Sequence, residues 1–193
     1  MSLENTHIVI IGAAGGIGSA LARSLRGRGA RLLLIGRDAG RLAALGAELD
    51  SPAKALDAAR VMDLEQALDS PITGGSIVLC TTAAARTGMA NHEAIAAATG
   101  GVMGLALSAA ATYAPRNIRV NCVAPGLVDT PLAARITSNE GALKASTAMH
   151  ALGRIGRPEE VASGIAWLLD PANSWVTGQV LGIDGGLGTL RPR

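Results

Sequence analysis

Short apolar stretches alternate along the chain with longer stretches in which apolar residues recur at the spacing of a helix. The apolar stretches predict β-strands over residues 7–11, 31–35, 53–61, 76–81, 118–124 and 179–183. The periodic stretches predict helices over residues 17–28, 39–49, 63–68, 93–113, 132–137, 141–149 and 158–169. Because strands and helices alternate, the pattern predicts an α/β fold, a three-layer sandwich in which helices cover a parallel sheet of about six strands.

The composition agrees with this architecture. The chain has 193 residues, of which 49% are hydrophobic and 17% charged, so it can bury a substantial core. Aromatic residues make up 2% and Phe is absent, so the core must consist of Ala, Val, Leu and Ile, which suit a parallel sheet under closely packed helices. No linker or repeat divides the sequence, and we expect residues 1–193 to form a single domain.

The charge pattern argues against several classes of partner. The net charge is +2 and the arginines are scattered, so we expect neither a nucleic-acid surface nor a membrane surface. No apolar run reaches the roughly 20 residues of a membrane span, and the spacing of Gly100 and Gly104 is interpreted as a close contact between helices. The first residues lack the basic segment of a signal peptide, and Cys80 and Cys122 are interpreted as buried thiols in predicted strands. We therefore expect a cytoplasmic protein, and we expect no metal site.

A glycine-rich loop joins the first predicted strand to the first predicted helix. Residues 12–18 read Gly-Ala-Ala-Gly-Gly-Ile-Gly. Glycine lets a pyrophosphate approach the backbone amides, and the helix start offers free N–H donors and the positive end of its dipole. The residues expected to form this Rossmann-type cofactor site are Gly12, Ala14, Gly15, Gly16, Ile17 and Gly18. A glycine-rich turn without a ligand is the alternative.

The residue after the second predicted strand bears on which nicotinamide cofactor is bound. A carboxylate there would accept hydrogen bonds from the adenosine ribose and repel a 2′-phosphate. This chain has Gly36-Arg37 instead, and a guanidinium can pair with that phosphate. We therefore expect NADP, with NAD as the alternative. The competing interpretation of Arg37 is a solvated loop residue.

Motifs along most of the chain resemble those of the short-chain dehydrogenase/reductase family. The first is Gly12-x-x-x-Gly16-x-Gly18, preceded by Ile11 where the family usually has Thr. Residues 118–126 read Ile-Arg-Val-Asn-Cys-Val-Ala-Pro-Gly, residues 153–162 read Gly-Arg-Ile-Gly-Arg-Pro-Glu-Glu-Val-Ala, and Asp-Gly-Gly stands at 184–186. The resemblance implies that Pro125, Gly126, Val128 and Thr130 also bind the cofactor, with the Thr130 hydroxyl holding the nicotinamide carboxamide.

The family's catalytic residues are a Ser, a Tyr and a Lys, with the Tyr as general acid/base. The resemblance places Thr82 at the Ser position, Ile95 at the Tyr position and Thr99 at the Lys position. Thr82 can still donate a hydrogen bond to a substrate, whereas Ile95 cannot transfer a proton and Thr99 carries no charge.

The chain offers few substitutes for the missing acid. Its single tyrosine, Tyr113, is eighteen positions beyond Ile95 on the same predicted helix, which corresponds to roughly 27 Å. Of its two lysines, Lys54 lies near the third predicted strand and Lys144 lies in the segment that covers substrate in the family. His92 is the best spare acid/base, because histidine titrates near neutrality. A solvated histidine at the start of a helix is the alternative interpretation.

The chain is several dozen residues shorter than the family pattern, and the shortfall lies between residues 63 and 74. The resemblance implies that the Asn-Asn-Ala-Gly strand and most of the following helix are missing, which leaves a shortened crossover at residues 62–75. We expect an exposed apolar patch or an oligomer contact where that helix would lie.

The resemblance implies an NAD(P)-dependent oxidoreductase, with NADP expected from Arg37, that acts on a small carbonyl or alcohol whose identity cannot be derived from the sequence. The alternatives are a catalytically inactive nucleotide-binding homologue and a truncated paralogue. The expected partners are the small-molecule substrate and further copies of the chain in a homo-oligomer.

Overall fold

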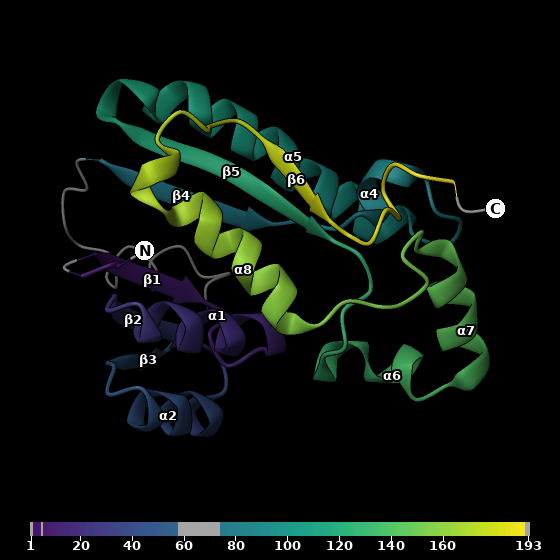
Figure 1. Cartoon of the computed structure of the whole chain (residues 1–193), viewed down its shortest axis with the longest axis horizontal. Helices are drawn as coiled ribbons and strands as arrows, with labels where there is room; N and C mark the ends of the chain where they lie inside the picture. Colours follow the sequence, from purple (N-terminus) through teal and green to yellow (C-terminus); the bar gives the residue numbers. More distant parts are fainter. Residues whose placement is uncertain (1, 5, 58–73, 192–193) are drawn as a thin grey trace. The chain divides into compact units, whose positions relative to one another are not determined.

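The computed structural model describes residues 2–4, 6–57 and 74–191 (Figure 1). The chain contains two compact units, Met1–Pro71 and Ile72–Arg193. Each unit has a parallel sheet of three strands, so the six described strands form two sheets.

The first unit repeats a strand–helix pattern. Its elements are β1 (His7–Ile11), α1 (Gly16–Gly27), β2 (Arg31–Gly36), α2 (Ala39–Glu48) and β3 (Ala53–Ala55). The strand order is β1-β2-β3, with His7 aligned to Arg31 and Leu34 aligned to Ala53. Both crossovers run in the same direction, so right-handed connections place α1 and α2 on the same face of the sheet.

The side chains of β1 alternate between a covered face and an exposed face. Ile8 and Ile10 are buried, whereas Val9 and Ile11 are 41% and 49% exposed. Successive side chains of a strand point to opposite faces, so α1 and α2 cover the face of Ile8 and Ile10. The other face of β1 carries exposed apolar side chains.

The second unit contains the remaining described strands and most of the helices. Its elements are β4 (Gly75–Cys80), α4 (Ala84–Thr87), α5 (Glu93–Tyr113), η1 (Ala114–Arg116), β5 (Ile118–Pro125), η2 (Pro131–Ala133), α6 (Ala134–Thr137), α7 (Glu140–Met149), α8 (Pro158–Leu169), η3 (Pro171–Asn173) and β6 (Val180–Ile183). The strand order is β4-β5-β6, and both pairs are parallel.

Helices cover both faces of this second sheet. On one face α5 packs against β5 in a buried cluster of Ala106, Ala110, Ile118, Val120 and Cys122. On the opposite face Ser76, which is aligned with Arg119, donates its hydroxyl to the Leu168 carbonyl of α8 at 3.0 Å. Figure 1 shows β5 between α5 and α8, the three-layer arrangement that the sequence predicts.

Helix α5 corrects one expectation about the chain. Glu93–Arg116 forms a helical segment of 24 residues, and its most apolar 18-residue stretch has a mean hydropathy of 1.7, so by length and composition the segment could cross a membrane. Thr and Ser side chains interrupt its apolar run, but no charge occurs between its two ends. The expectation that no apolar run reaches the length of a membrane span is therefore wrong. A single such helix is a weak indication, because a sheet-covering helix has the same composition, and α5 does pack on β5.

Gly100 and Gly104 do not form the predicted close helix contact within the described part of the chain. A Cβ at either position would meet no atom within 4 Å. Cys122 is buried as expected, but Cys80 is exposed. The expectation for Cys80 is wrong because β4 is an edge strand of its sheet and Cys80 is its last residue.

Most predicted elements lie where the sequence places them. β1, α5 and α8 begin and end at the predicted residues, whereas α4 was not predicted. β3 ends at Ala55 instead of residue 61, because its pairing partner β2 ends at Gly36, which is aligned with Ala55. The predicted helix at 63–68 and most of the shortened crossover at 62–75 lie outside the described residues.

Candidate cofactor-binding site

The glycine loop between β1 and α1 is tied to the end of β2. The N–H groups of Gly12 and Ala13 donate to the Ile35 carbonyl at 2.8 and 3.0 Å. Gly12 has a φ of +81°, a left-handed conformation that favours glycine. Gly15 is the N-cap of α1, no side chain caps this helix, and its first turn contains no acidic residue. The first N–H groups of α1 can therefore bind an anion.

Gly18 lets α1 approach the loop closely. A Cβ at Gly18 would overlap with the Gly12 carbonyl oxygen and would lie 3.0 Å from the Ala13 Cα, both of which are backbone atoms. A Cβ at Gly15 would lie 3.2 Å from the same oxygen. The loop thus forms a compact turn at the helix start that contains only glycine and alanine up to Gly16, and these residues fit the pyrophosphate of a dinucleotide.

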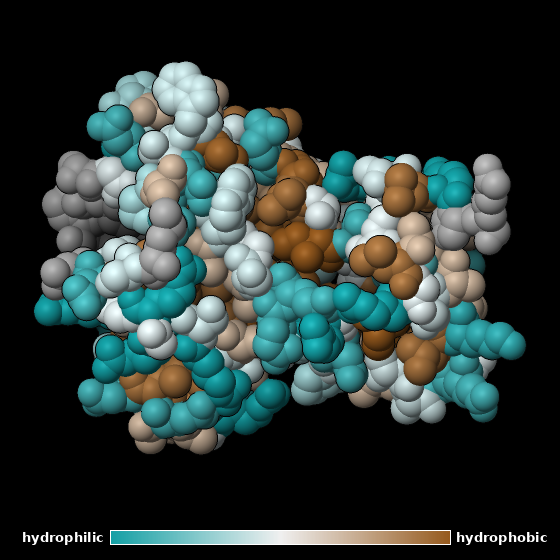
Figure 2. Space-filling view, in the orientation of Figure 1, coloured by the Kyte–Doolittle hydropathy of each residue, from teal (hydrophilic) through white to brown (hydrophobic). Residues whose placement is uncertain are grey.

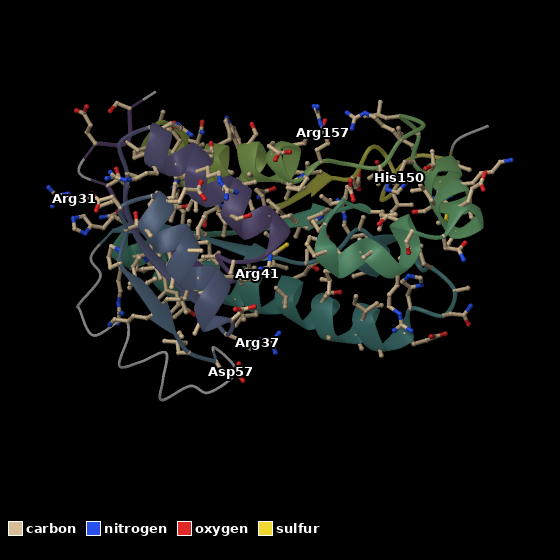
Figure 3. All side chains as sticks on the ribbon, turned by 90° about the horizontal axis from the view of Figure 1, so that it is seen from below. Arg31, Arg37, Arg41, Asp57, His150 and Arg157 are labelled. Atoms are coloured by element: carbon tan, nitrogen blue, oxygen red, sulfur yellow. The ribbon has the colours of Figure 1, made fainter. Side chains whose placement is uncertain are left out.

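Two arginines lie at the end of the first unit where β2 finishes. Arg37 follows β2 directly and is exposed. Asp38 is the N-cap of α2, and its Oδ1 accepts the N–H of Arg41 at 3.0 Å. Figure 3 shows Arg37 and Arg41 at the same end of this unit as Asp57, with Arg31 at the opposite end. The two guanidinium groups make this end suitable for a phosphate.

In the second unit, the segment after β5 is fixed by contacts from distant parts of the chain. The Gly156 N–H donates to the Leu127 carbonyl at 2.8 Å, and the Asp129 N–H donates to the Gly156 carbonyl at 2.9 Å. His150 Nε2 accepts the Leu127 N–H at 3.1 Å. The Thr130 hydroxyl lies 3.4 Å from the Val128 carbonyl, a weak local contact.

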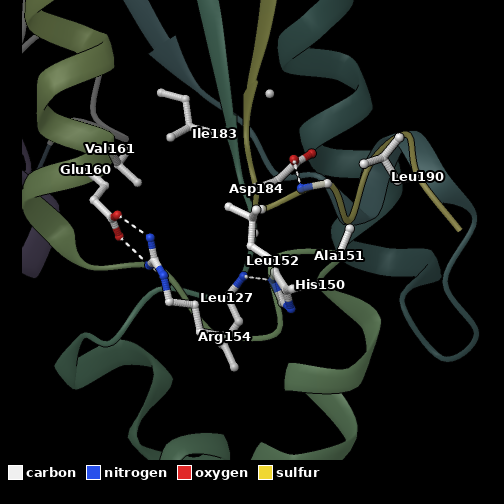
Figure 4. A pocket seen from close by; sticks show the side chains of 15 residues that line it. Leu127, His150, Ala151, Leu152, Arg154, Glu160, Val161, Ile183, Asp184 and Leu190 are labelled. Carbon is white, nitrogen blue, oxygen red and sulfur yellow. Dashed lines mark hydrogen bonds and ion pairs between the residues drawn. The ribbon is translucent and has the colours of Figure 1, made fainter. Parts of the chain in front are cut away.

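A pocket of about 380 Å³ lies beside this segment, within the second unit (Figure 4). Residues lining it include Leu127, His150, Leu152, Glu160, Ile183 and Asp184. Glu160 accepts two hydrogen bonds from the Arg154 guanidinium, at 2.7 and 2.9 Å, and one from the Arg157 backbone N–H at 2.8 Å. These bonds, those of Arg154 first, lower the pKa of Glu160 to about 2.

The other carboxylate of the pocket is also satisfied. Asp184 accepts the N–H groups of Gly186 and Gly188, each at 2.9 Å. Both carboxylates thus have partners within the wall, and the rest of the lining is largely aliphatic and glycine. Such a lining suits an uncharged part of a ligand.

Thr82 lies after β4, beside the first half of α5. Its Oγ1 accepts the Ala84 N–H at 3.3 Å, which leaves the hydroxyl proton to donate elsewhere. The neighbouring Thr81 donates its hydroxyl to the Thr99 carbonyl at 2.9 Å. The structure therefore brings the segment that contains Thr82 against the helical turn of Ile95 and Thr99.

His92 is the N-cap of α5 and is partly buried. Its Nδ1 lies 2.8 Å from the Ala90 carbonyl, which can only accept, so the Nδ1–H is occupied by the loop before the helix. Nε2 is the nitrogen that would exchange a proton with a ligand.

Residues 6–70 match the family described as short chain dehydrogenase, and residues 71–188 match the family described as Enoyl-(Acyl carrier protein) reductase. The chain belongs to the short-chain dehydrogenase/reductase family.

Curated relatives from bacteria are similar to part of this short-chain dehydrogenase/reductase chain. Cis-4-hydroxycyclohexanecarboxylate dehydrogenase of Sinomonas cyclohexanicum is 46% identical over 112 residues, which are 58% of this chain and 44% of the relative. A 3-oxoacyl-(acyl-carrier-protein) reductase of Thermotoga maritima is 43% identical over 113 residues, 58% of this chain and 45% of the relative. The chain thus spans less than half the length of the curated relatives it matches.

Solved structures of short-chain dehydrogenase/reductases share the fold along nearly the whole chain. One from Mycobacterium ulcerans has a TM-score of 0.88 and 25% sequence identity, and the alignment covers 100% of this chain and 93% of the solved chain. Another, from Beutenbergia cavernae, is described as NAD(P)-dependent and has NADP bound at low occupancy. Its TM-score is 0.85 and its sequence identity 26%, and the alignment covers 96% of this chain and 98% of the solved chain. These likenesses confirm the Rossmann-type α/β fold.

Three residues considered above as substitutes for the missing acid lie on α5, β3 and α7. Tyr113 ends α5 and packs beside the cluster under that helix, with the Arg116 guanidinium 5.8 Å from its ring centroid. Lys54 is on β3 and Lys144 is on α7, and both are exposed. No cluster of three or more metal-ligating side chains occurs among the described residues.

Two features of the short-chain dehydrogenase/reductase site were not predicted. Arg41 could have been found from its spacing, because it lies four residues after Arg37 in the first turn of a predicted helix. His150 gave no such signal, since its contact with Leu127 spans 23 residues of sequence.

We predict that Gly18→Ala destabilises the first unit by about 1–3 kcal/mol, because the added Cβ overlaps backbone atoms that cannot rotate away. Gly27→Ala in the same helix is the control. A Cβ there would meet no atom within 4 Å, so that change should be neutral or stabilising by up to about 1 kcal/mol. Urea unfolding followed by circular dichroism measures both. Equal unfolding midpoints for the two variants would contradict the close contact.

Proposed function

We propose that this short-chain dehydrogenase/reductase chain binds NADP(H) and has the site of an oxidoreductase for a small carbonyl or alcohol, with slow turnover because the residues that transfer the proton are replaced. The observation that carries the proposal is the glycine loop at the start of α1, in which Gly18 packs directly on the Gly12 backbone. An uncapped helix start after a parallel strand is the arrangement that receives a dinucleotide pyrophosphate. NADPH, when bound, supplies the hydride for reduction of a carbonyl.

The preference for NADP over NAD rests on Arg37 and Arg41. Neither the end of β2 nor the residue directly after it carries a carboxylate to accept ribose hydroxyls. Asp38 comes next and is the N-cap of α2, where its Oδ1 accepts the Arg41 N–H. A 2′-phosphate would pair with the guanidinium groups through charge-assisted hydrogen bonds.

We propose cyclic alcohols and ketones as the substrate class. The printed names of two relatives, the Sinomonas enzyme and a 2,5-dichloro-2,5-cyclohexadiene-1,4-diol dehydrogenase of Sphingobium indicum, support this class. The largely aliphatic lining of the pocket beside Leu127 is compatible with an uncharged ring.

We further propose that the chain is a shortened form whose proton-transfer residues are replaced. Ile95 stands at the family's Tyr position and Thr99 at its Lys position, while Thr82 retains a hydroxyl at the Ser position. The exposed Val9 and Ile11 side chains support a missing covering element on their face of the first sheet. The relatives, all dehydrogenases or reductases by name, do not favour a protein without catalysis. The argument that remains for a catalytically inactive protein is that Ile95 and Thr99 cannot transfer a proton or carry a charge.

We also propose a cytoplasmic homo-oligomer that associates through α5. Leu105 is 58% exposed on this helix, and a Cβ at Gly100, Gly101 or Gly104 would meet no atom within 4 Å, so a second helix could approach closely. Two free cysteines support a reducing compartment.

We predict that Leu105→Lys, which places a charge in the proposed contact on α5, shifts the mass in sedimentation equilibrium towards that of one chain. A wild-type protein that already sediments as a monomer, or as a membrane-bound species, would contradict this proposal.

We predict that Arg37→Asp reverses the cofactor preference. Loss of the guanidinium and repulsion by the new carboxylate should weaken NADPH binding roughly 10- to 100-fold, since hydrogen bonds to charged groups contribute about 1.5–3 kcal/mol. NADH binding should stay equal or improve. Isothermal titration of both cofactors measures the ratio. Arg31→Asp, at the other end of β2, should leave it unchanged (Figure 3). Similar NADPH-to-NADH ratios in wild type and Arg37→Asp would refute the assignment.

We predict that the wild-type chain reduces ketones very slowly or not at all. Reduction of a carbonyl forms an alkoxide that must be protonated, and a positioned acid typically contributes about 10²–10⁴-fold to the rate. Ile95 supplies no proton, and Thr82 offers one neutral hydrogen bond, worth about 0.5–1.5 kcal/mol net. The measurement follows NADPH absorbance with a panel of cyclic ketones.

Two variants and one control make this prediction specific. Ile95→Tyr combined with Thr99→Lys should raise the rate, whereas Ile95→Phe combined with Thr99→Met, of similar size without a titratable group, should not. His92→Ala tests the substitute acid. Turnover by wild type at ordinary enzyme rates would contradict the prediction, and its loss in His92→Ala would identify His92 as the acid.

A further inference from the structure

His150 is a buried histidine whose two ring nitrogens both have partners. It follows α7 directly and is 2% exposed. Its Nδ1 lies 2.7 Å from the Ser146 carbonyl, and its Nε2 lies 3.1 Å from the Leu127 backbone nitrogen. A carbonyl can only accept and a backbone N–H can only donate, so Nδ1 carries the proton and Nε2 does not. The two partners thus assign one neutral tautomer.

The imidazole lies directly against the backbone of the segment after β5. A Cβ at Gly126 would lie 2.6 Å from His150 Nε2 and 3.0 Å from the Asp184 carbonyl oxygen. Gly126 therefore gives the ring room to reach the next residue, Leu127. The family resemblance assigns the dipeptide Pro125-Gly126 to cofactor binding. In this chain the imidazole of His150 also packs against Gly126 of that dipeptide.

His150 contributes a side-chain anchor to a segment that is otherwise held by backbone groups. The Gly126 N–H donates to the Ile183 carbonyl at 3.3 Å, and the Asp129 N–H donates to the Gly156 carbonyl at 2.9 Å. Between them, the Leu127 N–H donates to His150 Nε2. The imidazole also joins this segment to the last turn of α7 through Ser146. Loss of the Nε2 acceptor would leave a half-buried N–H without its partner, which is costly.

We propose that His150 is a positioning residue, whose neutral imidazole holds the Leu127 amide and so fixes residues 125–130 for the nicotinamide end of the cofactor. This inference rests on the proposed binding of NADP(H). His150 acts through the backbone of Leu127.

The hydrogen bond itself can be tested in the wild-type chain without any ligand. An N–H···N bond transmits a scalar coupling between its two nitrogens, so NMR of the 15N-labelled protein should show a coupling between the Leu127 amide nitrogen and His150 Nε2. The 15N shifts of the ring should report a protonated Nδ1 and an unprotonated Nε2. An assigned spectrum without the coupling, or with the opposite tautomer, would overturn the proposal.

Two conservative variants separate the two ring contacts. The amide oxygen of His150→Gln can take the place of Nε2 and accept the Leu127 N–H, whereas the shorter side chain of His150→Asn can replace only the Nδ1 contact with Ser146. Amide exchange at Leu127 should rise roughly three- to tenfold in His150→Asn and stay near wild type in His150→Gln. The Asp129 amide in the same segment and the Ala30 amide in the first unit serve as references. Equal acceleration at all three amides in His150→Asn would show a loss of global stability and would overturn the proposal.

The effect of His150 on cofactor binding is tested by comparing the affinities for NADPH and for 2′,5′-ADP, which carries the adenosine phosphates but no nicotinamide. His150→Asn should weaken NADPH binding roughly three- to tenfold and leave 2′,5′-ADP binding unchanged, and His150→Gln should restore NADPH binding. Equal weakening of both ligands would assign His150 a purely structural role and overturn the proposal. If wild type binds neither ligand, the proposed function is wrong, and the coupling and exchange measurements alone decide whether His150 fixes the segment.

Discussion

The first unit depends on one contact that leaves no room for a side chain. At Gly18 the helix α1 lies directly on the Gly12 carbonyl, so the turn between β1 and α1 is as tight as a backbone permits. The Gly12 and Ala13 amides then reach the Ile35 carbonyl of the neighbouring strand, which joins the turn to the sheet. The helix start is held at the carboxyl end of the strands with its N–H groups uncapped, and this geometry creates an anion site without any charged side chain.

The second unit positions its candidate site by a different means. Its central strand β5 is covered by α5 on one face and α8 on the other, so the segment that leaves β5 at Pro125 starts from a rigid point. From there the segment is held by Gly156 and by His150, which belong to the connection between α7 and α8. A ligand-binding loop built in this way keeps its shape because its backbone groups have partners before any ligand arrives.

The two candidate functions of this chain, binding and proton transfer, depend on different residues. Binding of the pyrophosphate needs backbone geometry, which glycine positions preserve. Proton transfer needs particular side chains, and under the proposed assignment of residues 95 and 99 to the family's Tyr and Lys positions, Ile95 and Thr99 do not provide them. A chain can therefore retain the fold and the glycine loop of a short-chain dehydrogenase/reductase and differ in the chemistry that follows binding.

The sequence by itself determined the features that depend on local order. Alternating strands and helices, the ends of β1, α5 and α8, the glycine loop and the identity of residues 95 and 99 can all be read from neighbouring positions, since periodicity and turn chemistry are local properties. Only the tertiary structure decided that β3 stops where β2 stops, that Cys80 is exposed at a sheet edge, that α5 leaves Leu105 uncovered, and that His150 reaches Leu127. Each of these depends on which distant segments pack together, and the burial of a side chain or the partner of a ring nitrogen is set by that packing and not by the residues beside it in the chain.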